Sequence, residues 1–400
     1  MSRTLNDFNE VRIADVGHAL RRNPNVDLTD LLHALPGYWP SGVVEDLRLI
    51  ERSASYEAAA ARRVLTQLSH TARDPDIGDE VRRLLPVPHA LDADWRFTVR
   101  TRELLLGIAD SHSPRQETLL LGTPSIFAHM CAQLDMRAAV LVDANRATVE
   151  AANRLAEGHA LLRAQEADLL AGADIGLAPI FDTVIADPPW YFAEHRSFLD
   201  AASALLVPDG AILMAAAPRG TRPGAEVDRE ELLAHAVAAG FDLVDTMAGV
   251  LEYTSSPFER AALRECGLAS VPTNWRRADL LVLRKSNRTP ADSVVGSLRP
   301  ADWLDGFSGR TRLKLHKCNM PASLEEDHFS GSVSASVSRL APERAIANLW
   351  TSGNGAFNVN RNLIASILEG DPGWQQSASG KVLLDVLERE VADFREWGWM

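Results

Sequence analysis

The spacing of apolar residues changes character near residue 117. Before that point, as in residues 44–52 and 56–68, apolar positions recur at the spacing of helices. Beyond it, short apolar runs alternate with helical stretches, and the runs lie at 118–121, 138–142, 160–165, 183–186, 211–215, 241–247 and 279–284. This alternation is typical of a parallel sheet with crossover helices. The pattern therefore predicts an α/β fold with seven strands in the middle of the chain.

The same pattern divides the chain into three predicted domains. Residues 1–110 are predicted to form a helical domain, with a winged-helix module as the alternative. Residues 111–286 hold the predicted sheet, and residues 287–400 form a small α+β accessory region with a strand at 311–316 and helices near 357–368 and 381–395. A chain of 400 residues has a natural length for two or three domains.

Cysteine usage and hydropathy indicate the compartment. Cys131, Cys266 and Cys318 lie far apart, without the paired spacing of a disulfide framework or a structural zinc site. We therefore expect no bound metal and a reducing environment. The first residues contain no apolar core of a secretory signal, and no stretch approaches an uncharged membrane span. The sequence predicts a soluble cytoplasmic protein with no membrane partner.

Charge is distributed unevenly along the chain. The net charge of −13 disfavours a protein that binds nucleic acid over its whole surface. Residues 111–255 carry 9 basic and 20 acidic residues, whereas residues 256–320 carry 12 basic and 6 acidic residues. The basic residues of interest are Arg276, Arg277, Arg284, Lys285, Arg288, Arg310, Arg312, Lys314 and Lys317. They form either a surface for nucleic-acid phosphates or an ordinary charged loop.

A chemically distinctive tetrapeptide follows the fourth strand run, namely Asp187, Pro188, Pro189 and Trp190. The prolines fix φ and supply no amide donors, so the Asp187 carboxylate and the Pro188 carbonyl can both project beyond the strand as acceptors. Two acceptors suit an NH2 group, and the indole offers a face on which a flat ring can stack. Tyr191 would extend this aromatic wall. The alternative is a stiff turn whose tryptophan packs inward.

Other strand ends carry residues suited to a nucleotide-like ligand. Gly122 follows the first run, where a small residue lets the backbone approach a ligand and the next helix amino terminus favours an anion; Thr123 and Ser125 complete this loop. Asp143 ends the second run 21 residues later, where an acid can accept bonds from ribose hydroxyls, or can instead cap the next helix. Asp168 follows the third run, where one possible role is that of a solvated loop acid.

With these residues in order, residues 117–285 resemble the class I S-adenosylmethionine-dependent methyltransferases. The resemblance implies a Rossmann-like seven-stranded sheet and S-adenosyl-L-methionine as the cofactor. It implies that Phe97 and Thr98, which precede the helix before the first strand, close over the methionine part. The other implied cofactor-binding residues are Gly122, Thr123, Ser125, Asp143 and Asp168.

The resemblance also implies an N-methyltransferase that acts on an exocyclic or aromatic amine, with adenine N6 of a nucleic acid or nucleotide as the first expectation. The DPPW spelling is that of the messenger-RNA adenine methyltransferases, although the motif order here is that of the unpermuted amino-methyltransferases. Glu252, Tyr253 and Pro257 are predicted to follow the sixth strand and overhang the cleft. The expected substrate-binding residues are Tyr191, Glu252, Tyr253, Arg276 and Arg277.

Two alternatives stay open. The chain also resembles the branched-chain polyamine aminopropyltransferases, which use an Asp-Pro-Pro turn, a decarboxylated cofactor and a polyamine substrate that suits the acidic centre. A second alternative is a non-catalytic module that kept the sheet and lost the cofactor. In that case a protein partner would bind the tryptophan-rich tail, which holds Trp303, Trp350, Trp374, Trp397 and Trp399.

Overall fold

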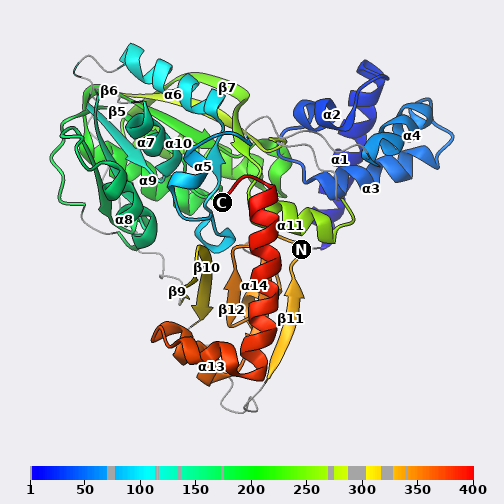
Figure 1. Cartoon of the computed structure of the whole chain (residues 1–400). Coiled ribbons are helices and arrows are strands. Elements are labelled where there is room, and N and C mark those ends of the chain that lie inside the picture. Colours follow the sequence, from blue (N-terminus) through cyan, green and yellow to red (C-terminus); the bar gives the residue numbers. More distant parts are fainter. Residues whose placement is uncertain are drawn as a thin grey trace. The chain divides into compact units, whose positions relative to one another are not determined.

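The computed structural model describes residues 2–69, 77–112, 115, 117–133, 137–172, 175–268, 274–286, 303–316, 328–338 and 341–400 (Figure 1). The chain divides into two compact units, each built from three stretches of sequence. Unit 1 comprises Met1–Arg73, Arg96–Thr254 and Ser270–Arg299, and unit 2 comprises Asp74–Trp95, Ser255–Ala269 and Pro300–Met400. The division into domains at residues 110 and 286 stays a prediction.

The large sheet of unit 1 contains all seven predicted strands. These are β2 (Glu117–Leu121), β3 (Ala138–Asp143), β4 (Leu162–Glu166), β5 (Phe181–Ala186), β6 (Leu206–Ala216), β7 (Phe241–Thr254) and β8 (Arg277–Lys285). A further short strand, β1 (Arg96–Phe97), pairs with β7, and the order is β1-β7-β8-β6-β5-β2-β3-β4. The neighbouring strands β6, β5, β2, β3 and β4 pair in parallel. Strand β8 runs antiparallel to both β6 and β7. The predicted Rossmann-like α/β fold is confirmed.

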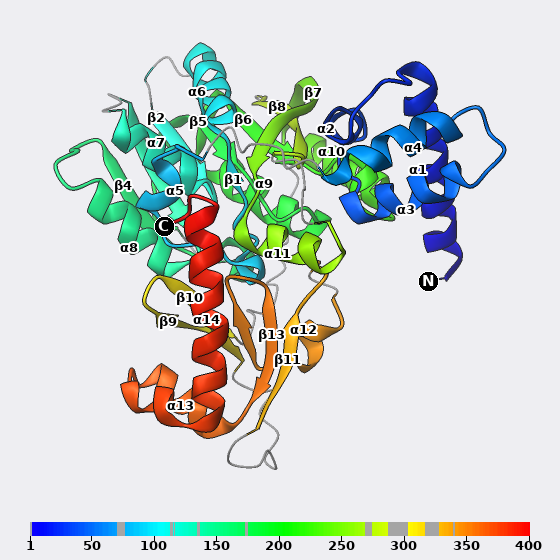
Figure 2. The same ribbon diagram turned by 45° about the vertical axis from the view of Figure 1, so that its right-hand side comes forward.

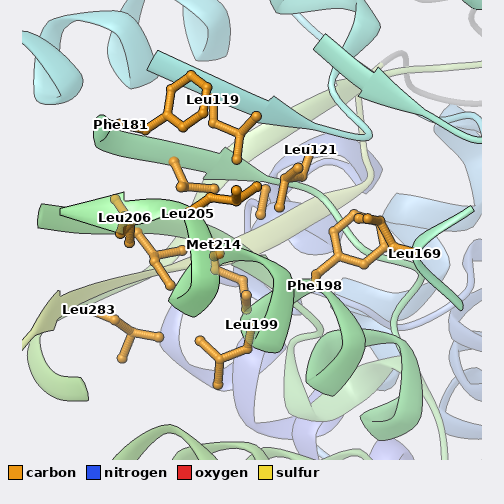
Figure 3. Packing of buried hydrophobic residues seen from close by; sticks show 14 of the residues in the cluster. Leu119, Leu121, Leu169, Phe181, Phe198, Leu199, Leu205, Leu206, Met214 and Leu283 are labelled. Atoms are coloured by element: carbon orange, nitrogen blue, oxygen red, sulfur yellow. The ribbon is translucent and has the colours of Figure 1, made fainter. Parts of the chain in front are cut away.

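Helices on both faces bury the apolar strand residues. These helices are α6 (Val99–His112), α7 (Pro124–Ala132), α8 (Arg146–Leu155), α9 (Phe192–Leu205) and α10 (Ala225–Ala238), with short 3-10 turns at Leu169–Ala171 and Arg219–Thr221. Figure 3 shows Phe198 and Leu199 of α9 packed with Leu121 of β2 and Met214 of β6. A parallel strand covered on both faces needs such a continuous apolar run, which explains why the central strands were readable from the sequence.

The N-terminal part of unit 1 is helical. It contains α1 (Ser2–Arg22), α2 (Leu28–Ala34), α3 (Pro40–Glu51), α4 (Ala58–Thr66) and the 3-10 turn Gln67–Ser69. Residues 2–69 hold helices and no strand. Helix α3 begins with Pro40 at its first position, where the missing amide costs nothing, and this fixes Trp39 at the junction between α2 and α3.

Unit 2 is built on an antiparallel sheet of order β11-β13-β12-β10-β9. Its strands are β9 (Trp303–Ser308), β10 (Thr311–His316), β11 (Phe329–Val333), β12 (Leu349–Thr351) and β13 (Gly355–Val359). Its helices are α5 (Val81–Leu84), α11 (Pro257–Glu265), α12 (Glu343–Ile346), α13 (Arg361–Leu368) and α14 (Ala378–Glu396), with 3-10 turns at Ala90–Asp92 and Pro372–Gln376. In Figures 1 and 2, α14 runs along this sheet, and its Leu383 and Leu387 join the core with Leu313 and Leu315.

Two expectations for the tail change in the structure. The helix expected near 357–368 begins only at Arg361, after the cap Asn360, because residues 355–359 pair with β11 and β12 as strand β13. Four of the five tail tryptophans are buried, namely Trp350, Trp374, Trp397 and Trp399. These four indoles therefore stabilise the core of unit 2 and present little surface to a partner. None of the described helices has both the length and the apolar character needed to cross a bilayer.

Candidate active site

The carboxyl ends of β3, β2 and β5 meet at one edge of the sheet. Leu121 pairs with Val142 on one side and with Ala186 on the other. The amide of Gly122 donates to the Val142 carbonyl (2.9 Å), and the amide of Asp187 donates to the Leu121 carbonyl (3.1 Å). These two bonds extend the ladder by one residue on each side of β2. They place the residues that follow β2 and β5 next to each other, at the edge where open α/β sheets bind ligands.

The two prolines of the turn after β5 offer carbonyl acceptors and no amide donors. Pro188 is buried, and the amide of Tyr191 donates to the Pro189 carbonyl (2.8 Å), which closes the turn before α9 begins at Phe192. Among the described residues, none donates a hydrogen bond to the Pro188 carbonyl. A carbonyl in this position needs a partner from water or a ligand.

Asp187 is bonded to a tyrosine from a distant strand. The Tyr253 hydroxyl donates to Oδ1 of Asp187 at 2.7 Å, and the Tyr253 side chain is only 1% exposed. Burial, followed by the Asp187 charge, raises the pKa of Tyr253 well above its ordinary value, so the phenol stays protonated. The expectation that Tyr253 and Glu252 follow the sixth strand is wrong, because both lie within β7, whose pairing with β8 continues to Glu252 opposite Arg277.

Two aromatic rings pack against the ring of Tyr253. The ring of Phe97 lies 4.8 Å from that of Tyr253 in a tilted arrangement, and the two residues pair between β1 and β7. The ring of Trp190 meets Tyr253 at an angle of 70° with centroids 5.7 Å apart. The Phe97 amide donates to the hydroxyl of Ser125 (3.3 Å), which joins β1 to α7. Four residues expected from the sequence therefore lie in one cluster with Asp187.

Arg276 and two further tryptophans extend the cluster. The Arg276 guanidinium lies 5.3 Å from the ring centroid of Trp190, 4.9 Å from that of Trp275 and 6.0 Å from that of Trp39. Trp39 and Trp275 pack edge to face at 5.2 Å. Such cation–π contacts hold a guanidinium in a fixed orientation. Trp39 lies between the N-terminal helices α2 and α3, where the sequence indicated no site residue. Its one signal in the sequence was its place as an aromatic residue directly before a proline that begins a helix.

Glu252 and Arg277 neutralise each other. They form an ion pair at 2.6 Å, and the largely exposed Arg100 approaches Glu252 at 3.5 Å. His33 of α2 lies beside this pair; its Nε2 is buried without a hydrogen-bond partner among the described residues. Burial, followed by the charge of Arg277, lowers the pKa of His33. His33 is a second N-terminal residue at this site that the sequence did not reveal.

The loop after β2 adopts a conformation that favours glycine. Gly122 has φ of +62°, and a Cβ there would lie 3.3 Å from the Asp187 carbonyl oxygen and 3.2 Å from the Phe198 ring. Thr123 precedes α7 as its N-cap residue but makes no side-chain cap bond. Its hydroxyl is buried and has no partner among the described residues, which costs about 1–3 kcal/mol unless a ligand satisfies it.

The two acids at the next strand ends are engaged locally. Asp143 accepts from the Asn145 amide (2.8 Å), while the cap of α8 is Asn145, which accepts from the Thr148 amide (2.9 Å). The alternative that Asp143 caps this helix is therefore wrong. Asp168 caps the short turn Leu169–Ala171 by accepting from the Leu170 amide (2.9 Å). Both side chains are half-buried.

Thr98 and Tyr191 have structural partners. Thr98 accepts from the Thr101 amide at the start of α6 (3.3 Å), and its own amide donates to the Glu252 carbonyl (3.1 Å). The Tyr191 ring lies 4.5 Å from the guanidinium of Arg222, which also donates to the Trp190 carbonyl (3.1 Å) and pairs with Asp228. A small cavity beside these groups is lined by Trp190, Tyr191, His195, Arg222, Asp228 and Leu232, the last two from α10.

The remaining basic residues that the structure describes have surroundings of different kinds. Arg312 and Lys314 lie in β10 of unit 2, where both are buried and paired with Asp92 and Asp305. The Lys285 ammonium donates to the carbonyls of Ser203 and Leu206 at 2.7 Å each. Arg310 donates to the Arg83 carbonyl in unit 2 (2.8 Å), Arg284 is exposed, and Arg288 and Lys317 lie outside the described residues. Pro257 begins α11 in unit 2.

Comparison with known proteins identifies the fold. No protein-family model and no curated protein matches the sequence. The branched-chain polyamine synthase from Thermus thermophilus, in complex with N4-aminopropylspermidine and 5'-methylthioadenosine, aligns over 73% of this chain and 96% of its own, with 14% identity and a TM-score of 0.53. Its C9 mutein aligns over 73% and 95%, with 16% identity and a TM-score of 0.51.

A smaller part of the chain aligns with TrmN from Thermus thermophilus, over 46% of this chain and 48% of that one, at 20% identity and a TM-score of 0.32. The likeness to the synthase extends over almost the whole synthase chain at a low identity. At such identities a structural match defines the fold and leaves the chemistry to be argued from the site. The protein thus has the Rossmann-like fold of the branched-chain polyamine synthase.

Proposed function

We propose that the protein is an S-adenosylmethionine-dependent N-methyltransferase that acts on an exocyclic or aromatic amine, with adenine N6 of a nucleic acid or nucleotide as the acceptor. One observation carries the proposal. The Asp187 carboxylate, held by Tyr253, and the Pro188 carbonyl, which receives no bond from the described residues, lie together after β5. Two neighbouring acceptors match the two hydrogens of an NH2 group.

The loop after β2 fits the cofactor. The unpartnered hydroxyl of Thr123 lies at the amino terminus of α7, where the helix dipole favours a carboxylate. Gly122 keeps this loop and the Asp187 turn in close approach, since a Cβ would crowd both. Asp143 would accept bonds from the ribose hydroxyls, and Asp168 would lie near the adenine amino group. Phe97 and Thr98 would line the methionine side.

The chain's own residues supply orientation and a proton acceptor. When bound, S-adenosylmethionine supplies an electrophilic methyl group, whose bond to sulfur breaks as its bond to the amine nitrogen forms. Asp187 and the Pro188 carbonyl accept the amine hydrogens, which localises the nitrogen lone pair and aims it. Trp190 holds the ring of the acceptor. The nitrogen becomes cationic and acidic, and it releases its proton to Asp187 or to water.

An aminopropyltransferase is the second candidate. The likeness to a branched-chain polyamine synthase, whose structures contain a polyamine and 5'-methylthioadenosine, favours it. A polyamine acceptor prefers acidic surroundings, but here Arg276 lies over Trp190 and Arg277 pairs with Glu252. A decarboxylated cofactor would also leave the Thr123 hydroxyl without its anionic partner. Both features favour methyl transfer.

Calorimetry of the full chain with S-adenosylmethionine and with its decarboxylated form tests the proposal. We expect binding of S-adenosylmethionine and weaker binding of the decarboxylated form. Tight binding of only the decarboxylated form would replace methyl transfer with aminopropyl transfer. If neither binds, both enzyme proposals fail and the non-catalytic alternative is favoured.

A threonine substitution sharpens this test. We expect Thr123→Val to weaken S-adenosylmethionine binding about tenfold, the usual value of one hydrogen bond to a charged group, and to leave the decarboxylated form unaffected. Thr118→Val is the matched control, because Thr118 also has a buried hydroxyl without a partner among the described residues but lies inside β2. Equal losses for the two cofactors in Thr123→Val would contradict the placement of the carboxylate.

Methyl incorporation identifies the acceptor. Radiolabelled S-adenosylmethionine is incubated with adenosine, adenosine monophosphate, single-stranded DNA, RNA and spermidine. The proposal predicts label on the adenine-containing acceptors and none on spermidine. Label on spermidine alone would exclude the aromatic amine as the acceptor and keep methyl transfer.

A further inference from the structure

We infer that Tyr253 is a positioning residue that joins the two functional groups of the DPPW turn, the Asp187 carboxylate and the Trp190 ring, into one fixed assembly. The inference rests on the proposed function only for its catalytic consequence. The link itself is a property of the protein. Because of this link, the orientation of the turn's side chains depends on a residue 66 positions away in the sequence. That residue lies on β7, which β8 and β6 separate from β5 in the sheet.

Tyr253 is held on several sides. Its amide donates to the Arg276 carbonyl (3.0 Å), and β1 pairs with it through Phe97. The Phe97 ring packs at 4.8 Å and the Trp190 ring at 5.7 Å. A phenol that is 1% exposed and enclosed by two rings has few rotamers open to it. The direction of its O–H bond to Asp187 is therefore set by packing.

Tyr253 contacts both functional groups of the turn. Its hydroxyl donates to Oδ1 of Asp187 at 2.7 Å, and its ring packs edge to face against the Trp190 ring with centroids 5.7 Å apart. The phenol thus orients the carboxylate through a hydrogen bond and the indole through ring packing. A donor to a carboxylate stabilises its ionised form. Tyr253 consequently fixes the orientation of the Asp187 carboxylate, and a substrate amine would share this carboxylate with the phenol.

A nuclear magnetic resonance titration tests the link without any need for activity. The full chain is labelled at aspartate Cγ, and the Asp187 signal is assigned by its loss in Asp187→Asn. In Tyr253→Phe we expect the titration midpoint of the Asp187 signal to rise by about one pH unit, a tenfold change from one lost hydrogen bond. Identical midpoints in Tyr253→Phe and the unsubstituted protein would overturn the inference.

The matched control is Tyr38→Phe. Tyr38 is also buried, and its hydroxyl donates to Asp15 at 2.8 Å in the same unit, so its removal deletes the same kind of bond elsewhere. It leaves the Asp187 midpoint unchanged. If Tyr253→Phe fails to fold, ring-labelled tyrosine in the unsubstituted protein decides instead. The Tyr253 signal then responds at the pH where Asp187 titrates, and an insensitive signal overturns the inference.

Kinetics then separate the positioning role from a structural one. Tyr253→Phe is expected to lower kcat about tenfold, with unchanged cofactor affinity and an acidic limb of the kcat–pH profile that moves to higher pH. An unshifted acidic limb would overturn the positioning role even if kcat falls. If the unsubstituted protein binds neither cofactor, the proposed function fails, and the titration still decides whether Tyr253 controls Asp187.

Discussion

Replacement of Asp187 by asparagine is expected to lower kcat for methyl transfer roughly 10³-fold, within the range of a positioned acid–base group. Asparagine keeps the size of the side chain and still bonds to Tyr253. It removes the negative charge beside the nitrogen as that atom becomes cationic, and it removes the proton acceptor. Because the loop of Gly122 and Thr123 is untouched, the cofactor dissociation constant should change less than about twofold. Single-turnover methyl incorporation and calorimetry measure the two quantities.

Asp182→Asn provides the matched control. Asp182 is a buried acid at the opposite end of the same strand, β5, and it accepts from the Arg115 amide at 2.8 Å. The asparagine oxygen can keep that bond, so the variant loses a buried charge from β5 without a change in the candidate site. We expect its kcat to equal that of the unsubstituted protein. An Asp187→Asn variant with kcat within tenfold of that value would remove Asp187 from the chemistry.

The sheet was predictable because its strands carry their own signals. Strands β2, β3 and β5 are covered on both faces and appear as continuous apolar runs. Their ends are marked by Gly122, Asp143 and Asp187, which interrupt the apolar pattern. The order of these ends along the chain predicted which residues share an edge of the sheet.

The partner of Asp187 was not predictable in the same way. The apolar run of β7 weakens after Met247, where Ala248 and Gly249 favour a turn, yet the strand continues to Thr254. Pairing with β8 holds this second half, with register shifts between Met247 and Leu251. Such shifts re-aim side chains, and no local pattern records them. The sequence pattern therefore predicted that Tyr253 lies in a loop.

The site residues of the N-terminal region could not be predicted from the sequence for a related reason. His33 and Trp39 lie about 240 residues before Asn274 and Trp275, which they approach in the structure. Helical periodicity reports which face of a helix is buried and not what that face meets. The residues of the basic segment were grouped by their proximity in the sequence alone. A linear count grouped Arg276 with Arg312, which the fold places in different units.

Unit 2 contains a buried acid that should control its stability. Glu390 of α14 is 7% exposed, and it accepts hydrogen bonds from the Thr351 hydroxyl and from the Gly353 amide (3.2 Å). Burial raises the pKa of Glu390 to about 7, the two hydrogen bonds oppose this rise, and the charge of Asp393 adds to it. The folded state therefore binds the Glu390 proton more tightly than the unfolded state does.

The sign of the effect follows from this difference. Below the unfolded pKa near 4.5 the carboxyl is protonated in both states, and its contribution to stability is fully present. As pH rises towards 7, the unfolded state releases the proton first, and the free energy of unfolding falls by about 3 kcal/mol for a pKa difference of this size. Glutamine cannot titrate. We therefore expect Glu390→Gln to gain about 3 kcal/mol over the unsubstituted protein at pH 8 and almost nothing at pH 4.5.

Urea unfolding of the full chain, followed by tryptophan fluorescence at several pH values, measures this difference. Glu388→Gln is the matched control, since Glu388 lies two residues away on the same helix with its side chain exposed, and it should follow the unsubstituted protein at every pH. The glutamine amide at position 390 can accept from the Gly353 amide and donate to the Thr351 oxygen, as the protonated carboxyl of Glu390 can. Stability curves for Glu390→Gln and Glu388→Gln that run parallel from pH 4.5 to 8 would show that Glu390 titrates at the same pH in the folded and unfolded states, and that its surroundings solvate the charge as well as water does.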